Sequence, residues 1–428
     1  MPVARGILGI GGLMLLAWLF SSNRRRFPWK IVIGGLVLQW GLALLILRSE
    51  TGKRIFDTIG LLIVKILEGG SAASRFLFEP FGDADARLTW YANVGVTILT
   101  TIILVATLSA VGYHFGVLQR LVAAMAWVMK RVMGVSGAES LAAAANVFFG
   151  QTEAPLLVRP YISAMTRSEL MALMTGGFAT VAAGVMAVYV RWLGGDDAAA
   201  SQAIARHLLT ASLMSAPAAF MMAKIMIPET EVPATFGRVV AVSERETRNL
   251  IDAVTAGASQ GMKLAINVLA MLIAFIALIT VLDMGLIAIG KTSLVSPLIS
   301  RIGLDQLDLD GLLGLLFSPV AWLMGVETAD CRTFGSLLGK AMATNELIAY
   351  KSLSETLRGG GMSSHSITMA IYSLCGFANI SSIGIQIGGI GVLAPDRRGD
   401  LVRLGPRAML GGAMACWMTG CIAGVLAR

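Results

Sequence analysis

The stretch NVFFGQTEAPLLVRPY at residues 146–161 sets Gln151, Thr152 and Glu153 among apolar residues, and a related stretch, TNELI, occupies residues 344–348. MGV precedes each of them, at residues 133–135 and 324–326, and GFATV or GFANI follows, at residues 177–181 and 376–380. Chance likeness between two Gly- and Ala-rich stretches does not account for three landmarks in one order. Duplicated halves with polar, helix-breaking centres are typical of secondary transporters.

Composition places the chain in a membrane. Hydrophobic residues make up 56% of the 428 residues and charged residues 14%, whereas soluble domains carry about 25% charged residues. The net charge of +8 does not indicate nucleic acid, because the basic residues concentrate in short loops, where they set orientation. The four cysteines show no metal-binding spacing and are interpreted as small apolar residues.

Continuous apolar windows of about 20 residues predict membrane-spanning helices rather than a barrel. We expect eight spans, at residues 7–21, 31–47, 88–115, 170–193, 203–227, 262–282, 367–392 and 404–426. Residues 55–67, 118–133 and 243–260 mix charged and apolar positions and are expected to lie in the membrane interface, although 243–260 could also be a soluble linker.

The two polar stretches are too costly to expose to lipid, so residues 137–165 and 328–353 are predicted to be re-entrant hairpins covered by protein. Three expected spans lie between them, and an odd number inverts the second copy. Basic loops place Arg24–Lys30 in the cytoplasm and both termini outside. The predicted fold class is therefore an all-α polytopic membrane protein with about eight transmembrane helices, two re-entrant hairpins in inverted repeats, and interfacial helices.

Each copy carries its own polar chemistry. In the first, Gln151 and Thr152 offer donors and acceptors that suit a neutral polar ring, and Thr180 lies where an opened helix would expose carbonyls to a hard monovalent cation. In the second, Glu346, Asn379 and Ser382 can hold vicinal hydroxyls. Glu346 could equally carry a proton, and the residues alone leave both roles open.

Together with GFATVAAGV (residues 177–185), NELIAY (345–350) and CGFANISSIGIQIGGIG (375–391), the first stretch closely resembles the concentrative nucleoside transporters. The resemblance runs from about residue 118 to the C-terminus and is to the bacterial eight-span form. It implies cation-coupled nucleoside uptake, by elevator-like movement of a transport domain against a homotrimeric scaffold, in a bacterial inner membrane.

The resemblance also implies roles for single residues. Nucleobase contacts fall to Gln151, Thr152 and Glu153, with Val185 nearby. Ribose contacts fall to Glu346, Asn379 and Ser382, with Phe377 packed beside them. The side chains of Asn146 and Thr180 and the carbonyls of Phe149 and Val181 would hold Na+, the expected coupling ion. The chain departs from the family pattern at Gly184, Glu327 and Leu347.

Four parts are expected along the chain: residues 1–117 as N-terminal helices and scaffold, 118–240 as the first repeat, 241–310 as the connecting scaffold, and 311–428 as the second repeat. The function predicted is Na+-coupled nucleoside symport, not enzymatic catalysis. Proton coupling is the alternative within the class. A membrane hydrolase acting through Ser259 and a solute channel are the alternatives outside it, and the inverted repeats favour a carrier over both.

Overall fold

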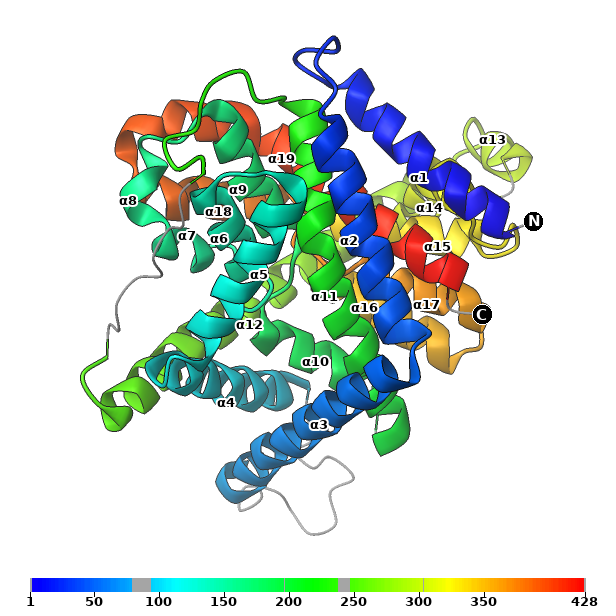
Figure 1. The fold of residues 1–428 in the computed structure, drawn as a ribbon. Coiled ribbons are helices and arrows are strands. Elements are labelled where there is room, and N and C mark those ends of the chain that lie inside the picture. The colour runs from blue at the N-terminus through cyan, green and yellow to red at the C-terminus, as the bar shows by residue number, and fades with distance from the viewer. Residues whose placement is uncertain (1, 79–93, 196, 238–246, 303, 427–428) are drawn as a thin grey trace.

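The computed structural model describes residues 2–78, 94–195, 197–237, 247–302 and 304–426, most of which form helices (Figure 1). The helices are α1 (Pro2–Leu19), α2 (Trp29–Leu47), α3 (Glu50–Phe78), α4 (Val94–His114), α5 (Val117–Met133), α6 (Gly137–Asn146), α7 (Ala154–Leu157), α8 (Arg159–Ile162), α9 (Arg167–Ala179), α10 (Ala183–Gly194), α11 (Ala198–Met226), α12 (Leu250–Gly290), α13 (Ser296–Arg301), α14 (Leu309–Met324), α15 (Cys331–Ala343), α16 (Glu346–Arg358), α17 (Ser364–Ser373), α18 (Ile380–Leu393), the 3-10 turn Pro395–Arg397 and α19 (Arg398–Leu426). This confirms the all-α class.

Length and apolar composition identify the helices that can cross a membrane. Among the described residues five segments qualify: α2, α9 with α10, α11, α12, and α19 with the turn before it. A sixth arises if α4 and α5, which are bent by 78° at their junction, count as one broken span. Helix α1 and the pair α17 and α18 occupy the remaining predicted spans, and neither α17 nor α18 is long enough to cross alone.

The two predicted hairpins are present. Helix α6 runs inward and ends at Asn146, and the chain turns through residues 147–153 before α7 and α8 lead back. In the second copy α15 and α16 form the two arms, and the turn between them is only Thr344–Asn345. Pro155 in the first turn of α7 fits because proline lacks the N–H that would be unsatisfied there.

The three landmarks of the duplication mark the same structural features in each copy. MGV ends the helix before each hairpin, where Gly134 (φ 73°) and Gly325 (φ 97°) adopt the left-handed conformation that glycine tolerates best. The second landmark is the hairpin turn. The third is a break in the following span, between α9 and α10 and between α17 and α18. The repeat is thus structural as well as sequential.

The first two helices share in the duplication. Helix α1 packs on α14 and α19, as α2 packs on α5 and α11. Glycine permits both close approaches: a Cβ on Gly34 would lie 2.8 Å from the Val132 carbonyl oxygen, and one on Gly9 would lie 2.6 Å from the Leu323 carbonyl oxygen. Val132 and Leu323 immediately precede the MGV landmarks. One helix therefore covers the equivalent site of each repeat.

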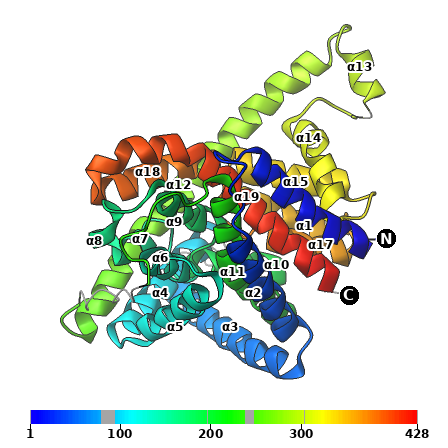
Figure 2. The same ribbon diagram turned by 45° about the horizontal axis from the view of Figure 1, so that its top comes forward.

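Two elements differ from what the sequence predicted. Residues 250–260, expected to lie in the interface, belong to α12, a single helix of 41 residues; residues 243–246 fall outside the described residues. The apolar helix α14 was not predicted, because its 16 residues are too few for a span. In Figure 2 the far end of α12, with α13, projects away from the rest of the molecule.

Candidate functional site

The second hairpin presents its acid to the break before α18. Asn379 Nδ2 donates to Glu346 Oε2 at 2.9 Å, and the Tyr189 hydroxyl on α10 donates to Glu346 Oε1 at 3.4 Å. Glu346 begins α16, and Asn345 caps that helix by accepting from the Ile348 amide. Glu346 and Asn379 are both buried. Two elements of the second repeat and one of the first therefore meet at this carboxylate.

Asn379 also holds the start of α18 in place. Its Oδ1 accepts from the Ser382 amide at 2.8 Å and from the Ser381 hydroxyl at 2.7 Å. The amide bond is the usual N-cap contact, which satisfies a backbone donor at the helix start. The same side chain thus caps a helix through its oxygen and reaches Glu346 through its nitrogen.

A buried amide pair joins the two repeats. Gln151 Nε2 donates to the Ser382 hydroxyl at 3.1 Å, and Gln386 Nε2 donates to Gln151 Oε1 at 3.1 Å and to the Met174 carbonyl at 3.1 Å. Thr152 also lies against α18, where a Cβ on Gly389 would come within 3.0 Å of its methyl group. The first hairpin turn is therefore fitted to the broken helix of the second repeat.

Glu153 turns the other way, toward α12. Its Oε1 accepts from Gln260 Nε2 at 2.6 Å and its Oε2 from the Gly150 amide at 3.3 Å. Both Glu153 and Gln260 line a cavity of about 210 Å³ between α4, the first hairpin, the start of α10 and α12. Tyr113 and Phe149 supply aromatic walls, and Thr247 a hydroxyl. The residues that line it all precede residue 265, so Glu346 is not among them.

Asn146 has the marks of a cation ligand. Its side chain is fully buried, and neither its Oδ1 nor its Nδ2 has a hydrogen-bond partner among the described residues. Such an orphaned buried polar group costs about 1–3 kcal/mol unless something else satisfies it. It lies beside Gly176, whose carbonyl accepts from the Thr180 hydroxyl at 2.9 Å. The donor set around the break, hydroxyl, amide and carbonyl oxygen, suits Na+.

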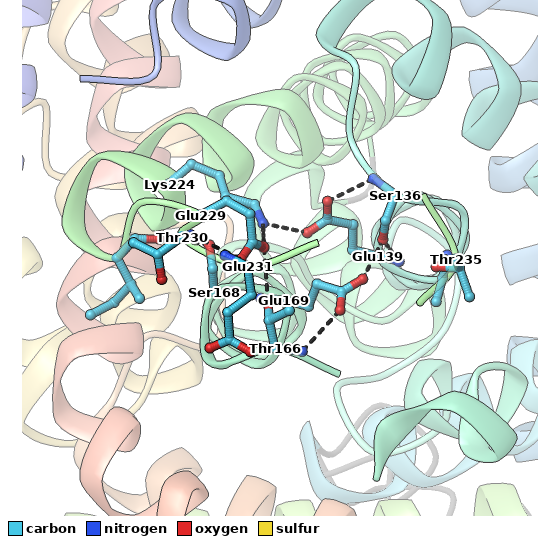
Figure 3. Close-up of polar contacts among 12 residues, drawn as sticks. Ser136, Glu139, Thr166, Ser168, Glu169, Lys224, Glu229, Thr230, Glu231 and Thr235 are labelled. Carbon is cyan, nitrogen blue, oxygen red and sulfur yellow. Dashed lines mark hydrogen bonds and ion pairs between the residues drawn. The ribbon is translucent and has the colours of Figure 1, made fainter. Parts of the chain in front are cut away.

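A buried ionic cluster fixes the root of the first hairpin (Figure 3). Lys224 on α11 pairs with Glu139 at 2.7 Å and with Glu229 at 3.3 Å, and Lys224 and Glu139 are each 2% exposed. The Ser136 hydroxyl donates to Glu169 Oε1 at 2.5 Å, and that of Thr166 to Glu229 Oε2 at 2.8 Å. Ser136 and Thr166 are also the N-caps of α6 and α9, each in a capping box. The starts of these helices and the end of α11 are held together.

The structure brings most of the predicted site residues into two groups. Gln151, Ser382, Asn379 and Glu346 form a connected polar group, while Asn146 and Thr180 adjoin Gly176. Glu153 is separate, on the α12 side. Val185 is buried on α10, and Phe377 is half-buried at the second break. The carbonyls of Phe149 and Val181 belong to the two non-helical turns beside Asn146 and Thr180.

Three polar partners were missed: Tyr189, Gln260 and Gln386. Gln386 is a fully buried amide within a predicted span, and polar residues at membrane depth are a signal of function that could have identified it. Gln260 follows Ser259 in the chain, and only Ser259 drew attention in the sequence, as the residue of a possible hydrolase. Tyr189 gave no signal, because aromatic residues are common in such helices.

Family profiles cover most of the chain. Residues 207–424 match the family described as "Na+ dependent nucleoside transporter C-terminus", residues 8–81 match its N-terminus, and residues 95–195 match "Nucleoside recognition". The chain belongs to the Na+ dependent nucleoside transporter family. The family consists of membrane transporters, and sodium is its coupling ion.

Individual relatives agree. "Solute carrier family 28 member 3" of Eptatretus stoutii is 37% identical over 96% of this chain and 59% of its own length. An uncharacterized transporter of Haemophilus influenzae is 37% identical over 99% of this chain and 98% of its own length. "Sodium/nucleoside cotransporter 1" of Rattus norvegicus is 34% identical over 98% and 63%. The chain thus spans about three fifths of these animal relatives and nearly all of the bacterial one.

Solved structures share the fold. CNTnw in an inward-facing substrate-bound state superposes with a TM-score of 0.86 at 34% identity, covering 100% of this chain and 98% of that one. A variant of CNTnw in an outward-facing state gives 0.85 at 34% identity, with the same coverage. The likeness therefore extends over the whole chain.

Proposed function

We propose that this protein carries nucleosides into the cell together with Na+. The observation that carries the proposal is the buried pair of Glu346 and Asn379 at the meeting of the second hairpin and the broken helix. A carboxylate and an amide so placed can accept from and donate to the two neighbouring hydroxyls of a ribose. The family descriptions, which name nucleoside transport and nucleoside recognition, support the same class of cargo.

Ribose would bind Glu346, Asn379 and Ser382, with Phe377 packed beside the sugar. Two buried polar atoms close to this group have no partner in the described structure, Asn345 Nδ2 and Gln386 Oε1. A bound sugar or base would satisfy such atoms, which are otherwise costly to bury. The nucleobase would lie toward Gln151, Thr152 and Glu153, with Val185 behind it on α10.

Sodium would be held by the Asn146 and Thr180 side chains and the carbonyls of Phe149 and Val181. The unpartnered amide of Asn146 supports this assignment, and so does the non-helical backbone of Thr180, which frees carbonyls from helical bonding. Na+ at this place would neutralise carbonyl dipoles at the break between α9 and α10. Occupation of the break would then favour the arrangement of the hairpin that receives the nucleoside.

The energy available is sufficient. One Na+ that enters down a tenfold gradient supplies about 1.4 kcal/mol, and a potential of about 100 mV adds about 2.3 kcal/mol. The sum supports accumulation of a neutral nucleoside by roughly several hundredfold. A channel cannot accumulate its solute, so concentrative uptake separates the two classes.

The movement proposed is an elevator: the two hairpins with α9–α11 and α17–α19 shift against α4 and α12. The similar protein CNTnw occurs in inward-facing and outward-facing states, which supports movement between two positions. We place the protein in a bacterial inner membrane with both termini outside, as a homotrimer. Most of the apolar surface of α12 is unburied in the single chain, as a helix at a lipid or subunit contact would be.

The test is uptake of radiolabelled uridine and adenosine into proteoliposomes under an inward Na+ gradient or an inward H+ gradient. We expect concentrative uptake with Na+ alone. Replacement Glu346→Gln should raise KM by about tenfold or more, because hydrogen bonds to a charged group contribute about 1.5–3 kcal/mol. The matched control is Glu355→Gln, an exposed acid on the same helix, which should behave as the wild type.

Each alternative has its own outcome. Uptake driven only by H+ would keep the substrate and overturn the sodium assignment. Absence of uptake of either nucleoside, from protein shown to be folded, would overturn the substrate. Equal effects of Glu346→Gln and Glu355→Gln would remove Glu346 from the site.

A further inference from the structure

Three consecutive residues of the first hairpin turn contact two different helices, α18 and α12. Gln151 and Thr152 lie against α18, whereas Glu153 reaches α12 through Gln260. In the described part of the chain this contact is the one side-chain hydrogen bond between α12 and either hairpin turn. By contrast, Glu346, the repeat mate of Glu153, takes its partners from α10 and from the break before α18. Glu153 of the first repeat is thus positioned by α12, a helix that belongs to neither hairpin nor broken helix.

From this asymmetry we propose that Gln260 of α12 is a base-specificity residue: it fixes the Glu153 carboxylate in the orientation that accepts a hydrogen bond from the nucleobase. The inference rests on the proposed nucleoside cargo. Gln260 is a positioning residue toward Glu153, and its own amide faces the same 210 Å³ cavity. The cargo would therefore be read jointly by a hairpin residue and a residue of α12.

The bond from Gln260 orients the Glu153 carboxylate and leaves it able to accept a hydrogen bond from a nucleobase. A carboxylate has about four lone-pair sites, and in the described structure Glu153 uses one oxygen for Gln260 and the other for the Gly150 amide. Sites therefore remain for a donor on the base. Without Gln260, the one remaining hydrogen bond of the Glu153 carboxylate in the described part of the chain is the longer bond of 3.3 Å to the Gly150 amide. The half-buried side chain is then free to adopt other rotamers.

A correctly oriented Glu153 would strengthen the binding only of a nucleobase that has a hydrogen-bond donor on the edge facing this carboxylate. The 6-amino group of adenosine and the N3–H of uridine are such donors, whereas nebularine (purine riboside) and N3-methyluridine lack them. A protein in which Glu153 is correctly held should prefer adenosine to nebularine and uridine to N3-methyluridine. A general loss of structure would weaken both members of each pair equally, so the ratio reports the positioning role.

The experiment measures Kd for both pairs on the purified full-length protein in detergent with Na+, and KM in proteoliposomes. For Gln260→Ala we expect the preference for the donor-bearing nucleoside to fall about tenfold, equal to about 1.4 kcal/mol, with Vmax nearly unchanged. Gln260→Glu cannot donate at neutral pH and should lose the preference too. Ser259→Ala, an adjacent exposed residue outside the cavity, should keep it.

Preference for adenosine over 3′-deoxyadenosine, which reports the sugar side, should stay as in the wild type in every variant. An unchanged donor preference in both Gln260 variants would overturn the role of Gln260 while leaving the transporter function intact. Equal weakening of all ligands would also overturn it, since that result indicates structural damage. Failure of the wild type to bind any of the nucleosides would instead overturn the proposed function itself.

Discussion

Lys224 shows how much a single buried cation can support. Its side chain is 2% exposed, and its ammonium group pairs with both Glu139 and Glu229. Glu169 lies in the same cluster and accepts a hydrogen bond from the Ser136 hydroxyl. Backbone amides at two helix starts satisfy part of this negative charge, because helix N-termini favour anions. The remainder depends on Lys224. Removing one partner of a buried ion pair leaves an uncompensated charge, which is far costlier than losing an exposed pair.

We therefore expect Lys224→Met to lower the free energy of unfolding by about 3–5 kcal/mol. Thermal unfolding in detergent, followed by tryptophan fluorescence, measures the change. Lys263→Met, an exposed lysine on α12, is the control. The double variant Lys224→Met with Glu139→Gln should recover part of the loss, because it also removes a stranded carboxylate. Equal unfolding midpoints for the two lysine variants would contradict the role assigned to Lys224.

At the scale of the helix, the tight crossings of α1 and α2 depend on glycine. We expect Gly34→Leu to destabilise the protein by about 1–3 kcal/mol or more, as overpacking does, because a Cβ there would lie 2.8 Å from the Val132 carbonyl oxygen. Gly41→Leu on the same helix has no atom of the described residues within 4 Å of its Cβ position and should be tolerated. The yield of monodisperse protein and its unfolding midpoint decide between them.

Gly9→Leu and Gly11→Leu repeat the comparison on α1. A Cβ on Gly9 would approach Leu323, whereas one on Gly11 would have no described neighbour within 4 Å. If α1 and α2 hold equivalent places in the two repeats, Gly9→Leu and Gly34→Leu should be similarly damaging. A strong effect in one and none in the other would mean that the likeness of the two crossings has no energetic counterpart.

The sequence predicted some helices and hairpins better than others, and the difference has a physical reason. The hairpins and helix breaks were predictable because Gly, Pro and polar residues are rare at membrane depth, and a short stretch of sequence is enough to recognise them. The start of α12 was misplaced because the charges near Asp252 resemble an interfacial segment, yet a helix of 41 residues simply extends beyond an apolar core of about 20. Helix α14 was missed because helices were predicted from apolar windows of about 20 residues, and α14 has 16 residues.

Partners across the fold were less predictable than elements. The residue types at Glu153 and Glu346 indicated acids with a function, but nothing in their spacing pointed to Gln260 or Tyr189. These contacts depend on how α10, α12 and the hairpin turns pack, which is a tertiary property. Gln151 with Ser382 was foreseen only as two members of one site, and their direct bond of 3.1 Å shows the repeats interlocked.

At the scale of the whole molecule, each hairpin root is tied to the start of the next helix. In the first repeat the Ser136 hydroxyl donates to Glu169, near the N-cap of α9. In the second, Asp330 accepts from the Ser363 amide at 3.1 Å and hydroxyl at 2.9 Å, at the N-cap of α17. Inverted repeats would place these two equivalent roots on opposite sides of the membrane, the first inside and the second outside by the distribution of loop charge.

The four native cysteines are buried, so single introduced cysteines can report sidedness against a low background. Ala164→Cys and Arg358→Cys are exposed positions at the connections before α9 and α17, the equivalent places in the two repeats. In intact cells a membrane-impermeant maleimide should label Arg358→Cys and should reach Ala164→Cys only after permeabilisation. Labelling of both from one side would mean that the repeats run parallel, and an elevator built on opposed hairpins would lose its basis. The reverse pattern would keep the inversion but place Arg24–Lys30 outside, which would contradict the orientation derived from loop charge.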